Sequence, residues 1–242
     1  MDRISPTLRP EDRPAGFQRW RHLLFLHWEV PASAVQALIP AELDVDTFEG
    51  RAYVGVVPFT MRDVSPWWSP SVPGISNFDE LNVRTYVHSK GSNPGVWFFS
   101  LDAASTIAVI AARAGWSLPY HRAKMRLSVQ GSDVEYASRR RFPGPTPADF
   151  ECRYSIGEGA GSAEPGTFEH FLAERYILYA RSRSALLLGR VHHKPYPLRR
   201  ASVHGLRESM VRATGLPQPT GEPHVLYSPG VDVDVFALKP VA

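Results

Sequence analysis

Prolines are spread along the whole chain and restrict what it can fold into. The sequence holds 22 of them among 242 residues, about twice the average share of roughly 5%. Proline lacks a backbone N–H and disrupts the interior of helices and of central strands. We therefore expect many short elements joined by fixed turns, and no bundle of long helices.

The hydrophobic pattern between the prolines is mostly that of strands. Apolar and polar residues alternate, or aromatic and β-branched residues cluster in short runs, and both patterns indicate strands. The predicted strands are residues 17–30, 52–59, 80–88, 96–101, 124–129, 134–142, 150–156, 176–179, 185–188 and 226–238. The predicted short helices are 31–39, 102–114 and 167–172, and residues 201–214 are expected to hold one more helix or a helical turn. This mixture predicts a mainly β (α+β) fold with an antiparallel sheet that is closed or strongly curled.

Residues 102–114 give the clearest helix signal. Ser105 or Asp102 is suited to cap its N-terminus, and Gly115 is suited to end it. The segment is apolar nearly all round until Arg113. We therefore expect this helix to be largely buried.

Composition and charge limit the partners of the chain. The 27 basic and 24 acidic side chains leave a net charge of +3, which is too small a surplus to require a nucleic-acid partner. The single cysteine, Cys152, excludes an intramolecular disulfide and a multi-cysteine zinc site and indicates a reducing compartment. We expect a small-molecule ligand and no nucleic-acid partner, and homo-oligomerisation is left open.

The chain reads as one domain with a short extension. Residues 1–16 carry three prolines and several charges and are expected to form a flexible N-terminal arm. Residues 17–242 are expected to form a single domain. No signal peptide is recognisable. The longest apolar stretch without a charge or proline is residues 103–112, about half of the roughly 20 residues that a membrane span needs. We expect a cytoplasmic protein without a membrane partner.

Common cofactor and metal motifs are absent from the sequence. It contains no glycine-rich dinucleotide or phosphate loop, no H-E-x-x-H and no G-x-S-x-G, so no cofactor is expected. His192 and His193 are adjacent and would point to opposite faces of a strand, which favours structural roles and no metal site. The run 139–141 of three arginines is typical of a solvated face.

Polar residues on one side of a predicted strand mark a candidate site. In residues 80–88, Glu80, Asn82 and Arg84 share one side, and Leu81 and Val83 share the other. If the polar side lines a cavity, it is the place for chemistry, and if it faces water, it has no special role.

A second candidate site follows the clearest helix. Tyr120, His121 and Lys124 lie close together there. Histidine exchanges protons near neutral pH, and a desolvated lysine attacks carbonyl groups. The alternative is that Lys124 is solvated and His121 only packs. The proline-rich loop 63–79 adds Trp67 and Trp68, which either cover a ligand as a lid or pack within the loop.

Seven stretches of the chain share a pattern with a bacterial family. They are residues 20–25 (WRHLLF), 43–59 (LDVDTFEGRAYVGVVPF), 80–87 (ELNVRTYV), 95–102 (GVWFFSLD), 118–120 (LPY), 171–176 (FLAERY) and 191–195 (VHHKP). These stretches cover most of residues 17–240. On them the chain is identified as a member of the YqjF-like family of bacterial proteins, a domain of unknown function.

The layout also resembles, more distantly, acetoacetate decarboxylase. Arg21 matches the opening arginine of that enzyme, residues 34–43 match a helix with its proline, and Pro119 matches the proline of its lysine motif. The resemblance implies an antiparallel, cone-like β-barrel with a central cavity and a few short helices packed on it. It also implies that Glu80, Asn82 and Arg84 point inward.

The chain departs from the decarboxylase at its catalytic residues. The paired lysines, of which one forms the Schiff base and the other depresses its pKa, correspond here to Tyr120 and His121. The acidic residue of the second strand is replaced by Val54 or Gly55. Lys124 lies three residues further on and would share a face with His121 only if a bulge shifted the register. Decarboxylation by the Schiff-base route is therefore not expected.

Three functions remain open. The first is a lyase- or isomerase-like enzyme that uses acid–base chemistry on a small oxo- or carboxylate-bearing molecule. The second is a small-molecule-binding module without catalysis, and the third is an interaction protein whose barrel is filled by side chains, without a cavity of about 300 Å³ or more. The candidate catalytic residues are His121, Tyr120, Glu80 and Lys124, and the candidate substrate-binding residues are Arg21, Arg84, Asn82, Trp67 and Trp68.

Overall fold

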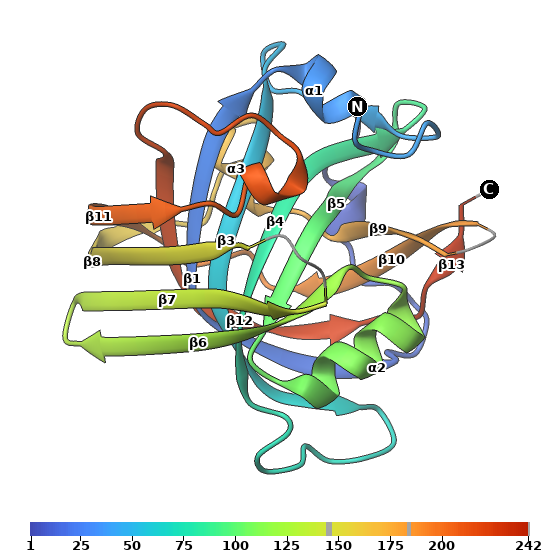
Figure 1. Ribbon diagram of the computed structural model, residues 1–242. Coiled ribbons are helices and arrows are strands. Elements are labelled where there is room, and N and C mark those ends of the chain that lie inside the picture. Colours follow the sequence, from blue (N-terminus) through green and yellow to red (C-terminus); the bar gives the residue numbers. More distant parts are fainter. Residues whose placement is uncertain (144–146, 183–184, 242) are drawn as a thin grey trace.

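The computed structural model describes residues 1–143, 147–182 and 185–241, and most of the chain lies in one large sheet (Figure 1). Its strands are β1 (Gly16–Val30), β2 (Asp44–Val45), β3 (Ala52–Pro66), β4 (Phe78–Ser89), β5 (Ser92–Ala103), β6 (Tyr120–Gln130), β7 (Asp133–Phe142), β8 (Asp149–Gly161), β9 (Ile177–Arg181), β10 (Leu186–His193), β11 (Leu198–Glu208), β12 (His224–Val235) and β13 (Lys239–Pro240). The helices are α1 (Ala32–Gln36), α2 (Thr106–Trp116) and α3 (Phe168–Ala173), with 3-10 turns η1 (Ser5–Thr7) and η2 (Arg212–Thr214).

The sheet returns on itself. Its strand order runs β13-β10-β9-β5-β6-β7-β8-β11-β12-β1-β3-β4-β2, and β4 also pairs with β5 while β10 also pairs with β12. Most pairs are antiparallel, as predicted, but β5 pairs in parallel with β6 and with β9. Parallel neighbours need a crossover connection, and α2 forms the crossover between β5 and β6.

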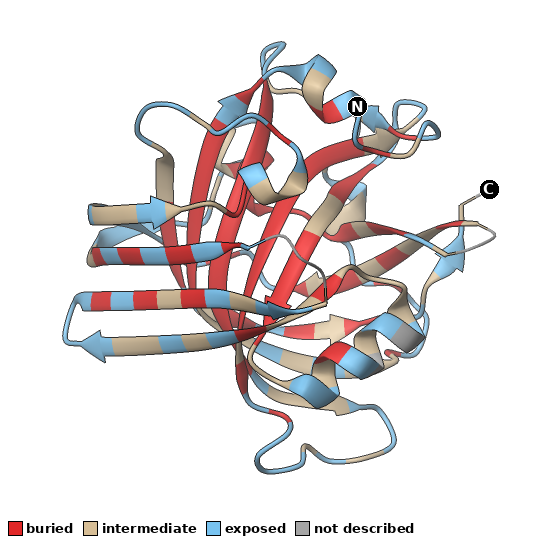
Figure 2. Cartoon of the chain, viewed as in Figure 1, coloured by how far each residue is buried: buried red, intermediate tan, exposed pale blue. Residues whose placement is uncertain are grey.

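The strands that enclose the core are buried along most of their length. Figure 2 shows long buried stretches in β4, in β3 up to Met61 and in β1 from Leu23, whereas β7 and the first half of β8 alternate between buried and exposed residues. Successive side chains of a strand point to opposite faces. Thus Val57 and Phe59 join one hydrophobic cluster and Val54 and Val56 another. The cluster that contains Val57 and Phe59 surrounds the candidate site.

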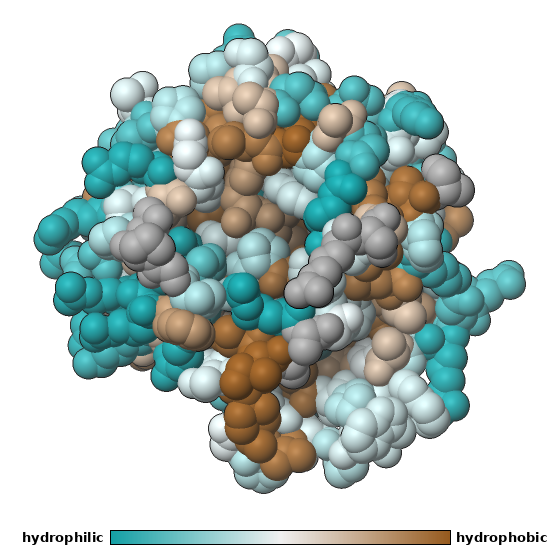
Figure 3. All heavy atoms as spheres, turned by 45° about the vertical axis from the view of Figure 1, so that its right-hand side comes forward, coloured by the Kyte–Doolittle hydropathy of each residue, from teal (hydrophilic) through white to brown (hydrophobic). Residues whose placement is uncertain are grey.

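Helix α2 differs from its prediction in its ends and in its burial. It begins at Thr106 after Ser105, whose hydroxyl accepts a hydrogen bond from the amide of Ala108, and Ser117 and not Gly115 ends it. Ile107 and Ile110 are 55% and 64% exposed. The helix lies on the outside of the sheet, so only one of its apolar stripes faces inward. The face that carries α2 accordingly shows hydrophobic surface (Figure 3).

Two other predicted segments also differ. Residues 201–214 do not form a helix, because β11 runs through Glu208 and pairs with β8 and β12, and only the short turn η2 follows. The predicted loop 63–79 is shorter, because β3 continues to Pro66 and β4 begins at Phe78. Pairing between distant strands overrides the local signal in both segments.

The N-terminal arm contacts the sheet at several points. Arg9 pairs with Asp234 at 2.9 Å, and Arg190 donates hydrogen bonds to the carbonyls of Pro6 and Leu8. None of the helices in the described part of the chain is long and apolar enough to cross a membrane.

Candidate functional site

A cavity of about 390 Å³ lies between the sheet and α2. This volume is within the range of roughly 300–1,000 Å³ for ligand pockets, and it does not fit the expectation of a barrel filled by side chains. Its walls are mostly apolar, with Leu23 from β1, Val57 and Phe59 from β3, and Leu101 from β5. Helix α2 contributes Ala108, Ala112 and Trp116, whose spacing of four places them on one side of the helix.

Three polar residues of β4 line this cavity. Glu80, Asn82 and Arg84 are 1%, 5% and 7% exposed, and the intervening Leu81 and Val83 belong to the cluster on the other face. The period of two along β4 therefore places Glu80, Asn82 and Arg84 on one side of the strand, and this side lines the cavity.

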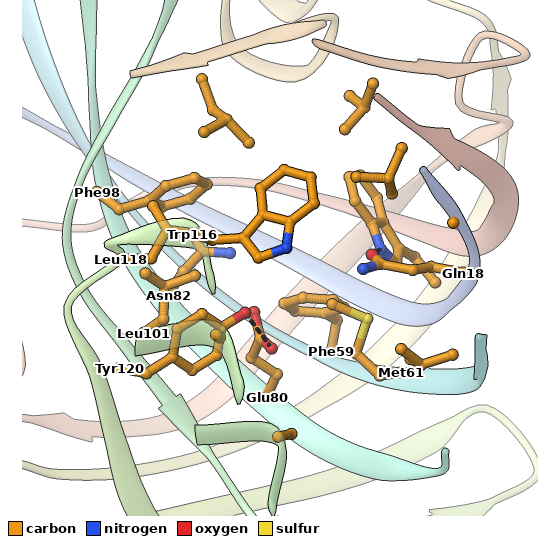
Figure 4. A pocket seen from close by; sticks show the side chains of 18 of the residues that line it. Gln18, Phe59, Met61, Glu80, Asn82, Phe98, Leu101, Trp116, Leu118 and Tyr120 are labelled. Carbon is orange, nitrogen blue, oxygen red and sulfur yellow. Dashed lines mark hydrogen bonds between the residues drawn. The ribbon is translucent and has the colours of Figure 1, made fainter. Parts of the chain in front are cut away.

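Glu80 and Tyr120 form a buried pair. The Tyr120 hydroxyl donates a hydrogen bond of 3.0 Å to Oε2 of Glu80. Figure 4 shows these two groups facing each other, with the indole of Trp116 projecting into the same space. Burial raises the pKa of Glu80 to about 8, against the lowering effect of the Tyr120 hydrogen bond. Glu80 is thus a neutral acid at pH 7, comparable to carboxylic acids that enzymes keep protonated to donate a hydrogen bond.

Arg84 lies at the deep end of the cavity. Its Nη2 donates a 3.0 Å hydrogen bond to the carbonyl of Leu172, and its buried Nε has no partner. Among the described residues no carboxylate pairs with it. The guanidinium faces the rings of Phe25 and Tyr86 at 5.6 and 5.8 Å from their centroids. Arg84 is therefore a buried cation that the described protein groups do not neutralise.

A second arginine that the sequence analysis did not single out also lines the cavity. Arg175 follows α3, and its Nη1 donates to Asp46 at 2.8 Å. Asp46 also pairs with Arg3, and the buried Nη2 of Arg175 has no partner. This end of the cavity consequently carries more guanidinium groups than carboxylates.

His121 and Lys124 do not line the cavity, which corrects the expected grouping with Tyr120. Tyr120 pairs with Leu101 and His121 with Asp102, and neighbouring residues of a strand point to opposite faces. His121 instead contacts the carbonyl of Pro143 through Nδ1 at 2.8 Å, and burial lowers its pKa to about 4. Lys124 is exposed on the β6–β7 hairpin.

Arg21 and the two tryptophans also lie outside the cavity lining. Arg21 donates to the carbonyl of Val231 at 2.8 Å and pairs with Asp232. Next to it, the positive φ of His22 interrupts the regular alternation of β1. Trp67 and Trp68 are 46% and 71% exposed. Arg21, which was expected to hold the carboxylate of a ligand, instead pairs with Asp232. Trp67 and Trp68, which were considered as a lid, are not among the residues that line the cavity.

Behind the cavity, Asp102 and Arg140 form a buried ion pair. Nη2 and Nε of Arg140 donate to Oδ1 of Asp102 at 2.8 and 3.0 Å, and the two side chains are 6% and 0% exposed. The negative charge of Asp102 contributes to the raised pKa of Glu80, after burial. The middle residue of the arginine run thus points inward, whereas Arg139 is 69% exposed.

Further lining residues were missed because no local pattern marks them. Gln18, Trp20, Trp116 and Tyr196 come from three separate segments, and Trp20 donates to the side chain of Gln18 at 2.8 Å. Among the described residues, no three His, Cys, Asp or Glu side chains come close enough to hold a metal ion together.

Comparisons with known proteins agree with the fold and the sequence pattern. The DUF2071 family, described as an uncharacterized conserved protein, matches residues 17–232. The uncharacterized protein YqjF of Bacillus subtilis (strain 168) is 35% identical over 222 residues, which cover 92% of this chain and 90% of that protein.

Solved structures of low sequence identity share the fold. An acetoacetate decarboxylase-like enzyme from Sphingomonas wittichii RW1 superposes with a TM-score of 0.64 at 11% identity, over 97% of this chain and 98% of that one. The enduracididine biosynthesis enzyme MppR, complexed with pyruvate, superposes with a TM-score of 0.63 at 11% identity, over 96% and 92%. With its sequence matched over residues 17–232, the chain belongs to the DUF2071 family and has the fold of acetoacetate decarboxylase-like enzymes.

Proposed function

We propose that the protein binds a small carboxylate-bearing molecule in this cavity and acts on it by proton transfer. The observation that carries the proposal is Arg84, a buried guanidinium in the cavity wall without a carboxylate partner among the described residues. An uncompensated buried charge costs several kcal/mol, and a carboxylate is the ligand that matches the fork of a guanidinium.

Glu80 is the proposed proton donor. Because it is neutral at pH 7, it can donate a hydrogen bond or a proton to an oxygen of the ligand. The Tyr120 hydroxyl then stabilises the carboxylate that remains. This places the acid–base chemistry on Glu80 and Tyr120, and leaves out His121 and Lys124 because neither lines the cavity.

A protein of the same fold supports the choice of ligand class. MppR was solved in complex with pyruvate, a small oxo acid. Oxo acids as a class carry both kinds of group that the cavity of this chain suits, a carboxylate for Arg84 and a carbonyl oxygen for Glu80, at a separation that depends on the length of the acid. A lyase- or isomerase-like reaction would use a proton donor of this kind.

Binding without catalysis is the second candidate function. Among the described residues no lysine lines the cavity, and the positions that correspond to the lysine pair of acetoacetate decarboxylase hold Tyr120 and His121. This alternative keeps the role of Arg84 and gives none to Glu80 in turnover.

We expect hexanoate to bind at least tenfold more tightly than hexanamide, which corresponds to about 1.4 kcal/mol. The two ligands share their carbon skeleton and differ in charge. Isothermal titration calorimetry should show that Arg84→Gln removes this preference, whereas Arg207→Gln, a substitution of an 87% exposed arginine, keeps it. An unchanged preference in Arg84→Gln would refute carboxylate binding at this residue.

Proton transfer is tested by hydrogen exchange of the ligand. We expect the wild-type protein in D₂O to accelerate deuterium incorporation next to the oxo group of an oxo acid, because a neutral Glu80 donates its proton to the carbonyl oxygen while solvent water takes the proton from the adjacent carbon, and the resulting enol takes up deuterium from the solvent on its return to the oxo form. Proton NMR with a panel of oxo acids measures this rate. Glu80→Gln should reduce the acceleration by a factor of 10² or more. Acceleration that persists in Glu80→Gln would contradict the role of Glu80, and no exchange with any acid would favour binding alone.

A further inference from the structure

The three polar residues of β4 form a row with a defined spacing. Glu80, Asn82 and Arg84 share the cavity face of one strand, and the pairing of β4 with β3 is regular along this stretch. At a rise of about 3.3 Å per residue, Glu80 and Asn82 lie about 7 Å apart along the strand, and Glu80 and Arg84 about 13 Å.

The side chains at the two ends of this row are held apart. The guanidinium of Arg84 is anchored on the carbonyl of Leu172 at 3.0 Å, which also accepts a hydrogen bond from Tyr86, the next residue on the same face of β4. At the other end, Tyr120 holds the Glu80 carboxyl. Asp102 is the charged neighbour that contributes to the raised pKa of Glu80, whereas Arg84 does not contribute to this pKa.

The path between the two ends is apolar. The pairing places Val57 and Leu101 on either side of Asn82, and both line the cavity. The buried Oδ1 of Asn82 has no hydrogen-bond partner. A ligand that reaches from one end to the other therefore needs a mostly apolar middle section. Asn82 Oδ1 can accept a hydrogen bond only from a ligand that carries an N–H or O–H group at this point.

The exposure of the lining residues indicates from which end a ligand enters the cavity. The lining residues of β3 become more exposed from the buried Val57 and Phe59 to Pro66, so the cavity opens beyond the row of Phe59 and Glu80. Arg84 lies at the opposite, deep end together with Arg175. An anionic head is therefore held deepest, where guanidinium groups outnumber carboxylates.

We infer that the cavity selects extended carboxylates, in which an oxygen-bearing group lies many bonds from the carboxylate and an apolar chain joins the two. This inference rests on the proposed function and names its substrate class. In short 2-oxo and 3-oxo acids, the carbonyl carbon is next to the carboxylate or one carbon away. Such acids are too short to reach Arg84 and Glu80 together.

Two isomers of one acid test the spacing. In an extended chain each bond advances about 1.1 Å, as in the three bonds of a 3.3 Å strand residue, so carbon 9 of 9-oxodecanoate lies about 9 Å from carbon 1. In 2-oxodecanoate, which has the same length and charge, the oxo group is beside the carboxylate. We expect 9-oxodecanoate to bind about three- to tenfold more tightly, because it adds one buried hydrogen bond to Glu80.

Calorimetry with three variants and two short acids separates the outcomes. Glu80→Ala should remove the preference for 9-oxodecanoate, whereas Glu135→Ala on the exposed side of β7 should keep it. Arg84→Gln should weaken both isomers. If pyruvate and acetoacetate bind as tightly as 9-oxodecanoate and still depend on Arg84, the inference fails and the proposed function stands. If no acid depends on Arg84, the proposed function itself fails.

Discussion

Replacing Glu80 with glutamine is expected to make the folded protein more stable than wild type at pH 8, by an amount that shrinks as the pH is lowered to 5. The pKa of Glu80 is about 8 in the folded state against an ordinary value of 4.5, mainly because of burial. Between these values the unfolded chain releases the proton and the folded chain keeps it.

The sign of this effect follows from proton linkage. A group whose folded pKa is raised binds more protons in the folded state, so the free energy of unfolding falls as the pH rises from 4.5 to 8. The slope is about 1.4 kcal/mol per pH unit, or roughly 4 kcal/mol between pH 5 and pH 8. Glutamine has no proton to lose and still accepts the hydrogen bond from Tyr120.

Urea unfolding of both proteins at several pH values between 5 and 8 measures this difference. The contributions of other titrating groups to the free energy of unfolding cancel in the difference between the two proteins, because both proteins carry these groups. Glu135→Gln is a matched control, since Glu135 is 53% exposed and pairs only at 3.5 Å with Arg126. A difference between wild type and Glu80→Gln that does not change with pH would show that Glu80 is ionised throughout.

Replacing Arg140 with glutamine is expected to lower the free energy of unfolding by about 3–5 kcal/mol, the usual cost of leaving one partner of a buried ion pair uncompensated. Asp102 is fully buried and accepts two hydrogen bonds to Oδ1 from Arg140. Without the guanidinium, this carboxylate has to be protonated or to remain buried as an unpaired charge.

The neighbouring arginine is the control for this prediction. Arg139 is 69% exposed and lies 3.6 Å from Asp149, so Arg139→Gln should change stability by less than about 1 kcal/mol. The double substitution Asp102→Leu with Arg140→Met should regain most of the loss, because apolar residues can replace a buried pair at little cost. If Arg139→Gln and Arg140→Gln lowered the free energy of urea unfolding by equal amounts, the ion pair between Arg140 and Asp102 would contribute no more to stability than an exposed pair.

Much of the strand pattern and the polar side of β4 could be predicted from the sequence, whereas the pattern did not decide whether this side faces a cavity or water. The alternation over residues 80–88 is a local property of extended backbone, and it correctly placed Glu80, Asn82 and Arg84 on one face. The helices are short, as the prolines indicate, but strands β1 and β3 each run for 15 residues and are longer than expected. Family membership followed from the seven matching stretches of the sequence.

The grouping of Tyr120 with His121 could not be decided in the same way. Any two neighbours on a strand face opposite sides, but which of them faces the cavity depends on how β6 pairs with β5. That pairing turns Tyr120 toward Glu80 and turns His121 and Asp102 toward Arg140. A run of three arginines likewise does not show which one is buried.

The sequence by itself determined most of the strands, the polar side of β4 and the family, because these depend on local backbone geometry and on residue identity. Only the tertiary structure decided that Arg175 lines the cavity together with Arg84, and that Tyr120 lines it together with Glu80. It also decided that Arg21, His121 and Lys124 lie outside the cavity lining. Such contacts join residues that are far apart in the chain. They depend on closure of the sheet, which also buries the site and thereby raises the pKa of Glu80.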